Sequence, residues 1–229
     1  MPSPVHCRRV AWDAMEDCLD RLETGGGLLA GALAIAAHAD PSVSPQRVES
    51  ELAGITARIA DRLVGDDPRA ILAHAHAVLF DELGFAGDVE EYYDPRNSFV
   101  QRVLERRRGL PITLTLIYKL VLEALGLRVA GVNTPGHFVA RVEAASGVRP
   151  MLVDPFAQGR VLSAAELVAR VRAIAGGTFA VDPERLPIAT HREWLLRMLR
   201  NLIGIHHARN EEIERAAMEE LSRLVRGAP

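Results

Sequence analysis

The chain has 229 residues, 48% of them hydrophobic and 5% aromatic, and a formal net charge of −3. This length and composition are typical of a soluble globular protein that buries a sizeable core in one compact unit. The slightly negative charge gives no long-range attraction to phosphate, so we expect binding neither to nucleic acid nor to an anionic membrane.

The cysteines of the N-terminal part indicate a reducing compartment. Its two cysteines, Cys7 and Cys18, lack CxxC spacing and form no disulfide framework. Asp13 and Glu16 interrupt the region where a signal peptide would have its apolar core, and the apolar run at 28–37 is too short to span a bilayer. We therefore expect a cytoplasmic protein without a membrane segment.

The first half of the chain has the signals of helices. Ser44 and Pro45 form a helix start, and apolar residues recur at helical spacing from Val48 to Leu63. Asp67 and Pro68 repeat that start for a helix that should end at Gly84. We predict a loop at 87–97 and another helix at 99–107.

The middle of the chain predicts one helix followed by three strands. Pro111 suits a first helical turn, and Gly126 ends the helix. The runs 129–132, 138–142 and 151–153 are rich in β-branched and aromatic residues and are separated by turn signals. In this arrangement His137 opens one strand and Asp154 ends a neighbouring one.

The last part returns to helices. Ser163 and Glu166 form a capping box for a helix that runs through Ile174. Gly176 and Gly177 end this helix, and a linker is expected at 183–190. Two amphipathic helices should follow, at 194–205 and 213–225.

His137 and Asp154 are the residues with the clearest chemistry. A histidine and an aspartate at adjacent strand ends can share a hydrogen bond that fixes the imidazole tautomer, as the base and its orienting acid do in nucleophilic catalysis. The nucleophile would stand at the start of the packed helix, where the N–H groups lower a thiol's pKa and hold an oxyanion. Here that place holds Pro111.

These residues resemble the transglutaminase-like fold, in which a Gly-x-Cys helix start is followed by a strand beginning with His and by Asp-Pro after another strand. The cysteine does not match. The matching residues are Gly109, Gly126, His137, Asp154 and Pro155.

More closely, the chain resembles the SirB family of transglutaminase-like proteins, from about residue 30 to 205. The motifs are Leu79 to Phe85, Tyr92 to Ser98, Val103 to Arg107, Gly109 to Leu114, Gly131-Val132, Pro135 to Phe138, and Asp154 to Phe156 with Gly159. Members of this family generally have proline at the cysteine position, so the resemblance implies that Pro111 follows a family rule.

The resemblance implies an α+β, papain-like architecture, with a small antiparallel sheet packed on a central helix. We expect a helical N-terminal part at 1–88, a transglutaminase-like core at 89–180 and a C-terminal helical pair at 181–229, together forming one compact unit. Many family members continue into tetratricopeptide-like helices, and the pair would be a truncated form of that array.

Three hypotheses remain for the function. In the first, the chain is a pseudoenzyme that binds a peptide, a protein segment or a small molecule in a groove near His137. In the second, His137 is the general base and Asp154 its orienter in cysteine-independent acyl transfer or amide hydrolysis, with Thr113 as a remote candidate nucleophile. In the third, the His137 pair is purely structural. Candidate binding residues are Asn97, Arg107, Pro111, Tyr118 and Gly136.

The sequence predicts no metal and no cofactor. His74 and His76 are two residues apart on a predicted helix and so point to different faces. His207 and Glu211 are four residues apart, but two ligands without a third are a weak signal. The oligomeric state cannot be inferred from the sequence.

Overall fold

The structure, a computed structural model, describes residues 3–23, 26–143, 150–175 and 185–227. The chain divides into two compact units, each made of segments that are separate in the sequence. Unit 1 consists of Met1–Val48, Glu90–Arg106 and Thr190–Pro229, and unit 2 of Glu49–Val89 and Arg107–Ala189. The division at residues 88 and 180 that the sequence suggested stays a prediction.

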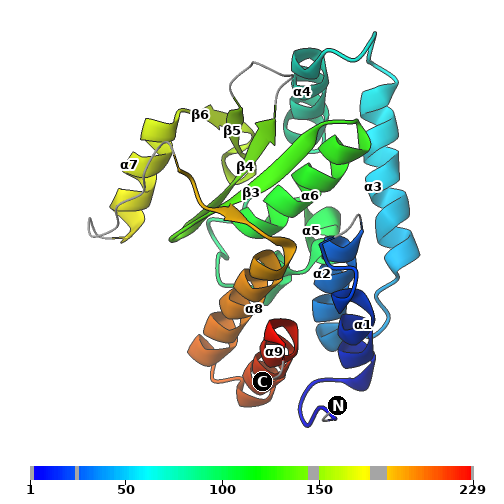
Figure 1. Ribbon diagram of the computed structural model, residues 1–229, viewed down its shortest axis with the longest axis vertical. Helices are drawn as coiled ribbons and strands as arrows, with labels where there is room; N and C mark the ends of the chain where they lie inside the picture. Colours follow the sequence, from blue (N-terminus) through cyan, green and yellow to red (C-terminus); the bar gives the residue numbers. More distant parts are fainter. Residues whose placement is uncertain (1–2, 24–25, 144–149, 176–184, 228–229) are drawn as a thin grey trace. The chain divides into compact units, whose positions relative to one another are not determined.

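Unit 1 is helical. Helix α1 packs on α2, and α8 packs on α9 (Figure 1). Gly31 permits the approach of α2 to α8, because a Cβ there would lie 2.3 Å from a methyl group of Leu195. The helices of unit 1 are α1 (Arg9–Leu19), α2 (Gly27–Ala39), the 3-10 helix η2 (Pro95–Ser98), α5 (Val100–Arg106), α8 (His191–Ala208) and α9 (Glu212–Arg226).

A buried carboxylate on α9 anchors the N-terminal segment of unit 1. Glu220 accepts hydrogen bonds from the backbone N–H groups of Val5, His6 and Cys7, the last at 2.9 Å. The imidazole Nδ1 of His6 lies 3.0 Å from the same carboxylate. Burial alone would raise the pKa of Glu220, but these donors lower it overall. The segment before α1 is thereby fixed to α9.

The helices of unit 2 begin where proline and capping signals predicted them. Helix α3 (Pro45–Ala60), which starts in unit 1, and helix α4 (Pro68–His76) confirm the two predicted starts. The predicted continuation to Gly84 is wrong in type, because Ala77–Glu82 forms a π-helix, η1. Phe80 of this wider turn stacks on a tyrosine of another helix, a tertiary contact that local sequence signals do not encode.

A five-stranded antiparallel sheet forms the centre of unit 2, in the order β6-β5-β4-β3-β7. The three predicted strands are confirmed. The two edge strands were missed, because runs of two or three residues are too short to show a period. The strands are β3 (Arg128–Thr134), β4 (His137–Glu143), β5 (Met151–Asp154), β6 (Arg160–Leu162) and β7 (Ile188–Ala189).

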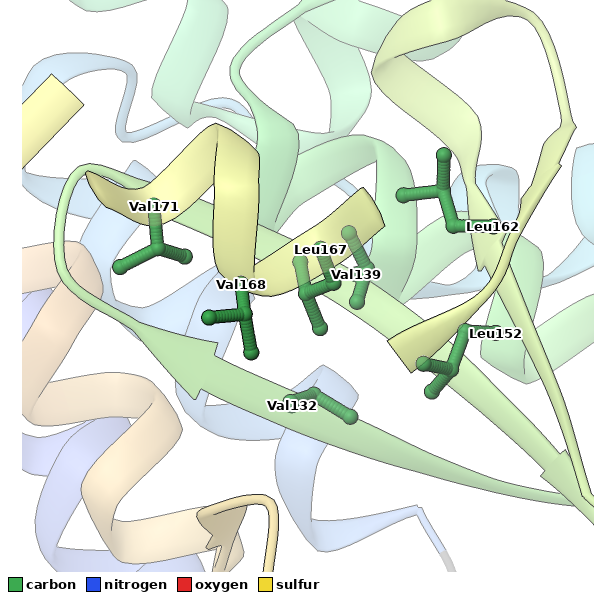
Figure 2. Packing of buried hydrophobic residues seen from close by; sticks show 7 residues of the cluster. All are labelled: Val132, Val139, Leu152, Leu162, Leu167, Val168 and Val171. Carbon is green, nitrogen blue, oxygen red and sulfur yellow. The ribbon is translucent and has the colours of Figure 1, made fainter. Parts of the chain in front are cut away.

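Two helices pack against this sheet. Helix α6 (Pro111–Ala124) packs on β3 and β4, and α7 (Ala164–Ala175) contributes to an apolar cluster with the sheet (Figure 2). The members of the cluster are Val132, Val139, Leu152, Leu162, Leu167, Val168 and Val171. Alternate residues of the strands thus build a core under α7.

A two-residue parallel ladder precedes α6. Strand β1 (Ala86–Gly87) pairs with β2 (Arg108–Gly109), with Gly87 opposite Gly109. Neither strand was predicted, because two residues are too few to show a period. Among the described helices, none combines the length and apolar composition that crossing a membrane requires.

Candidate functional site around His137

His137 and Asp154 meet on the sheet of unit 2. His137 is the first residue of β4, Asp154 is the last of β5, and these strands pair with Ala140 opposite Val153. Side chains of alternate residues share a face, so His137 and Asp154 point to the same side. The imidazole Nε2 lies 2.7 Å from Oδ2 of Asp154. The exposed fractions are 5% and 0%, so the pair is buried.

Asp154 has further partners at both carboxylate oxygens. Oδ1 accepts the backbone N–H groups of Phe156 at 3.1 Å and Ala157 at 3.2 Å, and thereby caps the 3-10 helix η3 (Pro155–Ala157). Oδ2, which contacts His137, also forms an ion pair with the guanidinium of Arg170. The carboxylate is therefore shared among four donors, and one of them carries a permanent positive charge.

Arg170 is the residue that sequence reasoning missed. It lies on α7, three residues after Leu167 and one before Val171, both of which are buried against the sheet. Residues three apart in a helix share a face, so an arginine on this apolar face was a readable signal for a buried acidic partner. The identity of that partner required the folded structure.

Helix α7 also covers the turn before His137. Gly136 has φ +70°, and a Cβ on it would lie 2.2 Å from a side-chain methyl of Ile174. Glycine is needed there both for the backbone conformation and for the close approach of α7. The predicted role of Gly136 in ligand binding stays a prediction, whereas its packing role follows from this contact.

Phe156 lies between His137 and β1. Its ring meets the imidazole edge to face, with centroids 6.2 Å apart. On another side the ring contacts Gly87, where a Cβ would lie 2.4 Å from the ring atoms. The backbone bond to Asp154 and these two contacts fix Phe156, which in turn limits how the imidazole can rotate.

The first turn of α6 lies beside the start of β4. Pro111 is buried, and the hydroxyl of Thr115 donates to its carbonyl oxygen at 2.8 Å. The same hydroxyl lies 3.4 Å from the carbonyl oxygen of Phe138, the residue after His137. The place where a nucleophile was expected thus adjoins the backbone at the start of β4 and holds a proline ring.

Thr113, the remote candidate for a nucleophile, is completely buried. Its hydroxyl has no hydrogen-bond partner within the described residues, so it is not bonded to His137. A hydroxyl needs a base within hydrogen-bond reach to attack a substrate. This arrangement does not favour Thr113 as a nucleophile.

Tyr118 forms a hydrogen bond with a histidine other than His137. Its hydroxyl lies 2.8 Å from Nε2 of His76, and burial raises the pKa of Tyr118 and lowers that of His76. Tyr118 also stacks on Phe80 and, with Pro155, helps line a small apolar pocket. The binding role predicted for Tyr118 stays a prediction.

Arg107 and Asn97 have structural partners in the units to which they belong. In unit 2, Arg107 adopts φ +59°, pairs with Glu51 at 3.0 Å and lies 4.8 Å above the Phe85 ring. In unit 1, the amide of Asn97 donates to the carbonyl of Glu91 at 2.7 Å and accepts from a nearby guanidinium. These contacts give both residues structural roles, and the binding roles predicted for them stay predictions.

Neither cysteine has the properties of a nucleophile. Burial, and secondarily the charge of Glu220, raises the pKa of Cys7 to about 12, and burial raises that of Cys18 to about 11. Both thiols therefore stay protonated at neutral pH. Within the part of the chain that the structure describes, no group of three or more His, Cys, Asp or Glu residues could hold a metal ion.

The comparison with known families bears on this site. The sequence model of the transglutaminase-like superfamily matches residues 46–200, which include the whole His137 pair. A UPF0162 protein of Pseudomonas aeruginosa is 31% identical over 220 residues, which are 95% of this chain and 78% of that protein. The chain belongs to the transglutaminase-like superfamily and groups with the UPF0162 proteins. The sequence resemblance to this superfamily is confirmed, and the narrower SirB name stays a prediction.

Other relatives share shorter regions. A UPF0162 protein of Xylella fastidiosa is 40% identical over 163 residues, which are 69% of this chain and 57% of that protein, so the chain spans little more than half of this relative. Human F-box only protein 21 is 33% identical over 102 residues, 42% of this chain and 16% of that protein. No solved structure matches the chain.

Proposed function

We propose that this transglutaminase-like chain is a binding module without acyl-transfer activity. Its ligand, a peptide, a protein segment or a small molecule, would contact the face of unit 2 around His137. The observation that carries the proposal is the sharing of one Asp154 oxygen between His137 and Arg170, together with the proline at the start of α6, Pro111, where a nucleophile was expected.

The surroundings of His137 support a site without a nucleophile. Nucleophilic catalysis needs a hydroxyl or thiol within hydrogen-bond reach of the base, and Asp154 is the hydrogen-bond partner of the imidazole among the described residues. Asp154 would have to stabilise the imidazolium that forms during turnover. The positive charge of Arg170 on the same oxygen works against that role.

The free-energy cost of burying the ion pair between Asp154 and Arg170 supports a function beyond packing. Buried ion pairs lose hydration, and replacing them by apolar residues is often neutral or stabilising. The neighbouring cluster under α7 consists of valine and leucine, so an apolar solution is available at this face of the sheet. A histidine, an aspartate and an arginine buried together at this face therefore favour a binding role over a purely structural one.

We further propose a narrower family, a location and a partner for the chain. They are membership in the SirB family, a cytoplasmic location and a peptide, protein or small-molecule partner. The competing enzyme, in which His137 activates a water or a substrate amine, receives no support from the contacts of Asp154. It is kept as an outcome of the test.

One panel of compounds tests both readings. The protein and its His137→Ala variant are incubated with a mixture of amides, esters, peptides and amine acceptors. Mass spectrometry then records the products, and affinity selection records the compounds that the protein retains. We expect no products from either protein, and peptides retained by the wild type that His137→Ala does not retain.

His207→Ala, which changes an exposed histidine of α8, is the matched control and should retain the same compounds as the wild type. Products formed by the wild type and lost in His137→Ala would replace the binding module with an enzyme. Equal retention by wild type and His137→Ala would mean that the ligand does not bind at the face around His137.

A further inference from the structure

The C-terminal half of α7 covers the His137 pair by contacts of its side chains. Arg170 binds Asp154, Ile174 lies against Gly136, and Val171 packs in the apolar cluster (Figure 2). These contacts lie on one side of the helix, which faces the sheet. They explain why His137 is 5% exposed although it stands at the end of a strand.

Within this ion cluster, Arg170 is the member that solvent reaches. Its side chain is 32% exposed, against 6% for His137 and 0% for Asp154. Ile174, which covers Gly136, is itself 52% exposed. The two side chains that contact Asp154 and Gly136 are therefore themselves in contact with solvent.

The two halves of α7 are attached differently. At the first turn, Glu166 accepts the N–H and hydroxyl of Ser163 and pairs with Arg160 of β6. The second half is attached through Arg170 and its apolar neighbours, without the backbone ladder that joins the strands. Segments held by side chains alone open at lower free energy than paired strands.

Release of the second half would leave no charge without a partner inside unit 2. Asp154 would keep His137 and the N–H groups of Phe156 and Ala157. Arg170, already partly exposed, would become hydrated. Opening therefore costs one ion pair and some apolar contact, and avoids the larger penalty of an unpaired buried carboxylate.

We propose that α7 is a removable cap on the His137 site and that the ion pair between Arg170 and Asp154 is its latch. With the cap docked, Asp154 is shared and His137 is covered. With the cap released, Asp154 serves His137 alone and the ends of β4 and β5 are open to a ligand. The identity of the ligand rests on the proposed function, but the movement of the cap does not.

Chemical labelling of His137 tests the cap without any ligand. Diethyl pyrocarbonate modifies accessible, unprotonated imidazoles, and peptide mass spectrometry at neutral pH gives the rate for each histidine. We expect Arg170→Ala to increase the labelling rate of His137 by about tenfold or more, since it removes the latch of a buried pair. Arg170→Lys should restore part of the protection.

Arg172→Ala is the matched control, because Arg172 lies on the same helix and is exposed. It should leave the labelling of His137 unchanged. Hydrogen exchange of the same variants should show faster exchange in α7 with Arg170→Ala, while α6 keeps its protection and the buried His38 of unit 1 keeps its slow labelling.

An unchanged His137 rate in Arg170→Ala would overturn the cap. So would a faster rate accompanied by loss of protection in α6, because Arg170 would then support all of unit 2. If the cap opens as expected but the compound panel yields no ligand, the proposed function fails while this inference stands.

Discussion

Two buried carboxylates of the chain, Asp154 in unit 2 and Glu220 in unit 1, bind their surroundings in nearly the same way. Each accepts hydrogen bonds from backbone N–H groups that follow one another in the sequence. Each also contacts one imidazole, at 2.7 Å for His137 and 3.0 Å for His6.

The two carboxylates differ in how their negative charge is balanced. Glu220 holds the N-terminal segment, and the side chain of its histidine is 43% exposed, so water screens the charge. Asp154 has no exposed surface, and its charge is balanced by Arg170. A buried contact between histidine and carboxylate therefore does not identify a functional site by itself. The added cation and the covering helix distinguish Asp154.

The largest expected effect comes from removing the charge of each carboxylate. Asp154→Asn puts a neutral amide in place of the buried charge that His137 and the partly exposed Arg170 share, and should lower the free energy of unfolding by about 3–5 kcal/mol. Glu220→Gln should cost about 1–2 kcal/mol, because it weakens hydrogen bonds and leaves no buried cation. Urea unfolding of both variants measures the difference.

Equal losses for these two variants would mean that Arg170 adds nothing to the burial of Asp154. The double variant Asp154→Asn with Arg170→Met sharpens the result. If the unpaired guanidinium causes the loss, the double variant should be more stable than Asp154→Asn alone.

The next effect tests the cover over His137. Gly126→Ala and Gly136→Ala both place a side chain at positive φ, with a cost of about 1–2 kcal/mol each. A Cβ at Gly126 meets open space, whereas one at Gly136 meets Ile174, which should add about 1–3 kcal/mol. Thermal or urea unfolding gives the two values.

Ile174→Ala in the Gly136→Ala background should recover part of this additional loss, because it removes the atoms that the new Cβ meets. No recovery would show that α7 does not press on Gly136. A covering helix would then no longer distinguish Asp154 from Glu220.

A smaller effect follows from the lowered pKa of Glu220. A carboxyl group whose pKa is lower in the folded state stabilises that state above its unfolded pKa, and the contribution is lost as the pH falls through the folded value. The stability difference between wild type and Glu220→Gln should therefore be full at neutral pH. It should be lost as the pH falls from neutral into acid, first below the unfolded pKa and then through the lower folded pKa of Glu220.

Denaturant unfolding across this pH range measures the difference. A difference that persisted in acid would mean that the backbone N–H groups hold the glutamine as well as the carboxylate. Glu220 would then act through shape and hydrogen bonds, with no contribution from its charge.

The smallest effect concerns a buried polar group that, unlike the two carboxylates, has no hydrogen-bond partner among the described residues. The buried hydroxyl of Thr113 has no partner in the described part of the chain, so Thr113→Val should change the free energy of unfolding by about 0–1 kcal/mol, toward higher stability. Thr115→Val is the control and should cost about 1 kcal/mol, because it removes the bond to the carbonyl of Pro111. A large loss from Thr113→Val would contradict a hydroxyl without a hydrogen-bond partner.

Local signals in the sequence predicted most of the helices and the three longer strands. Proline after Ser44 and Asp67 marked two helix starts, and Gly126, with φ +87°, marked the end of α6. These signals act within a few residues and are therefore readable from the chain. The helix end predicted at Gly176 and Gly177 and the first residues of the predicted linker lie outside the described residues.

The structural features that the sequence did not predict have one cause in common. The π-helix at Ala77–Glu82, the short strands β1, β2, β6 and β7, and the bond of Tyr118 to His76 depend on what packs against them. Elements of two or three residues have no period of their own. Pairing with a neighbour that is distant in the sequence creates them.

The sequence by itself determined the superfamily and the pairing of His137 with Asp154, because both depend on residue types in a fixed order. The tertiary structure alone decided that Arg170 shares the carboxylate and that α7 covers the pair. The spacing along the chain locates Arg170 on an apolar helix face, but its partner is chosen only when that face meets the sheet, since a buried charge must find its counterpart there.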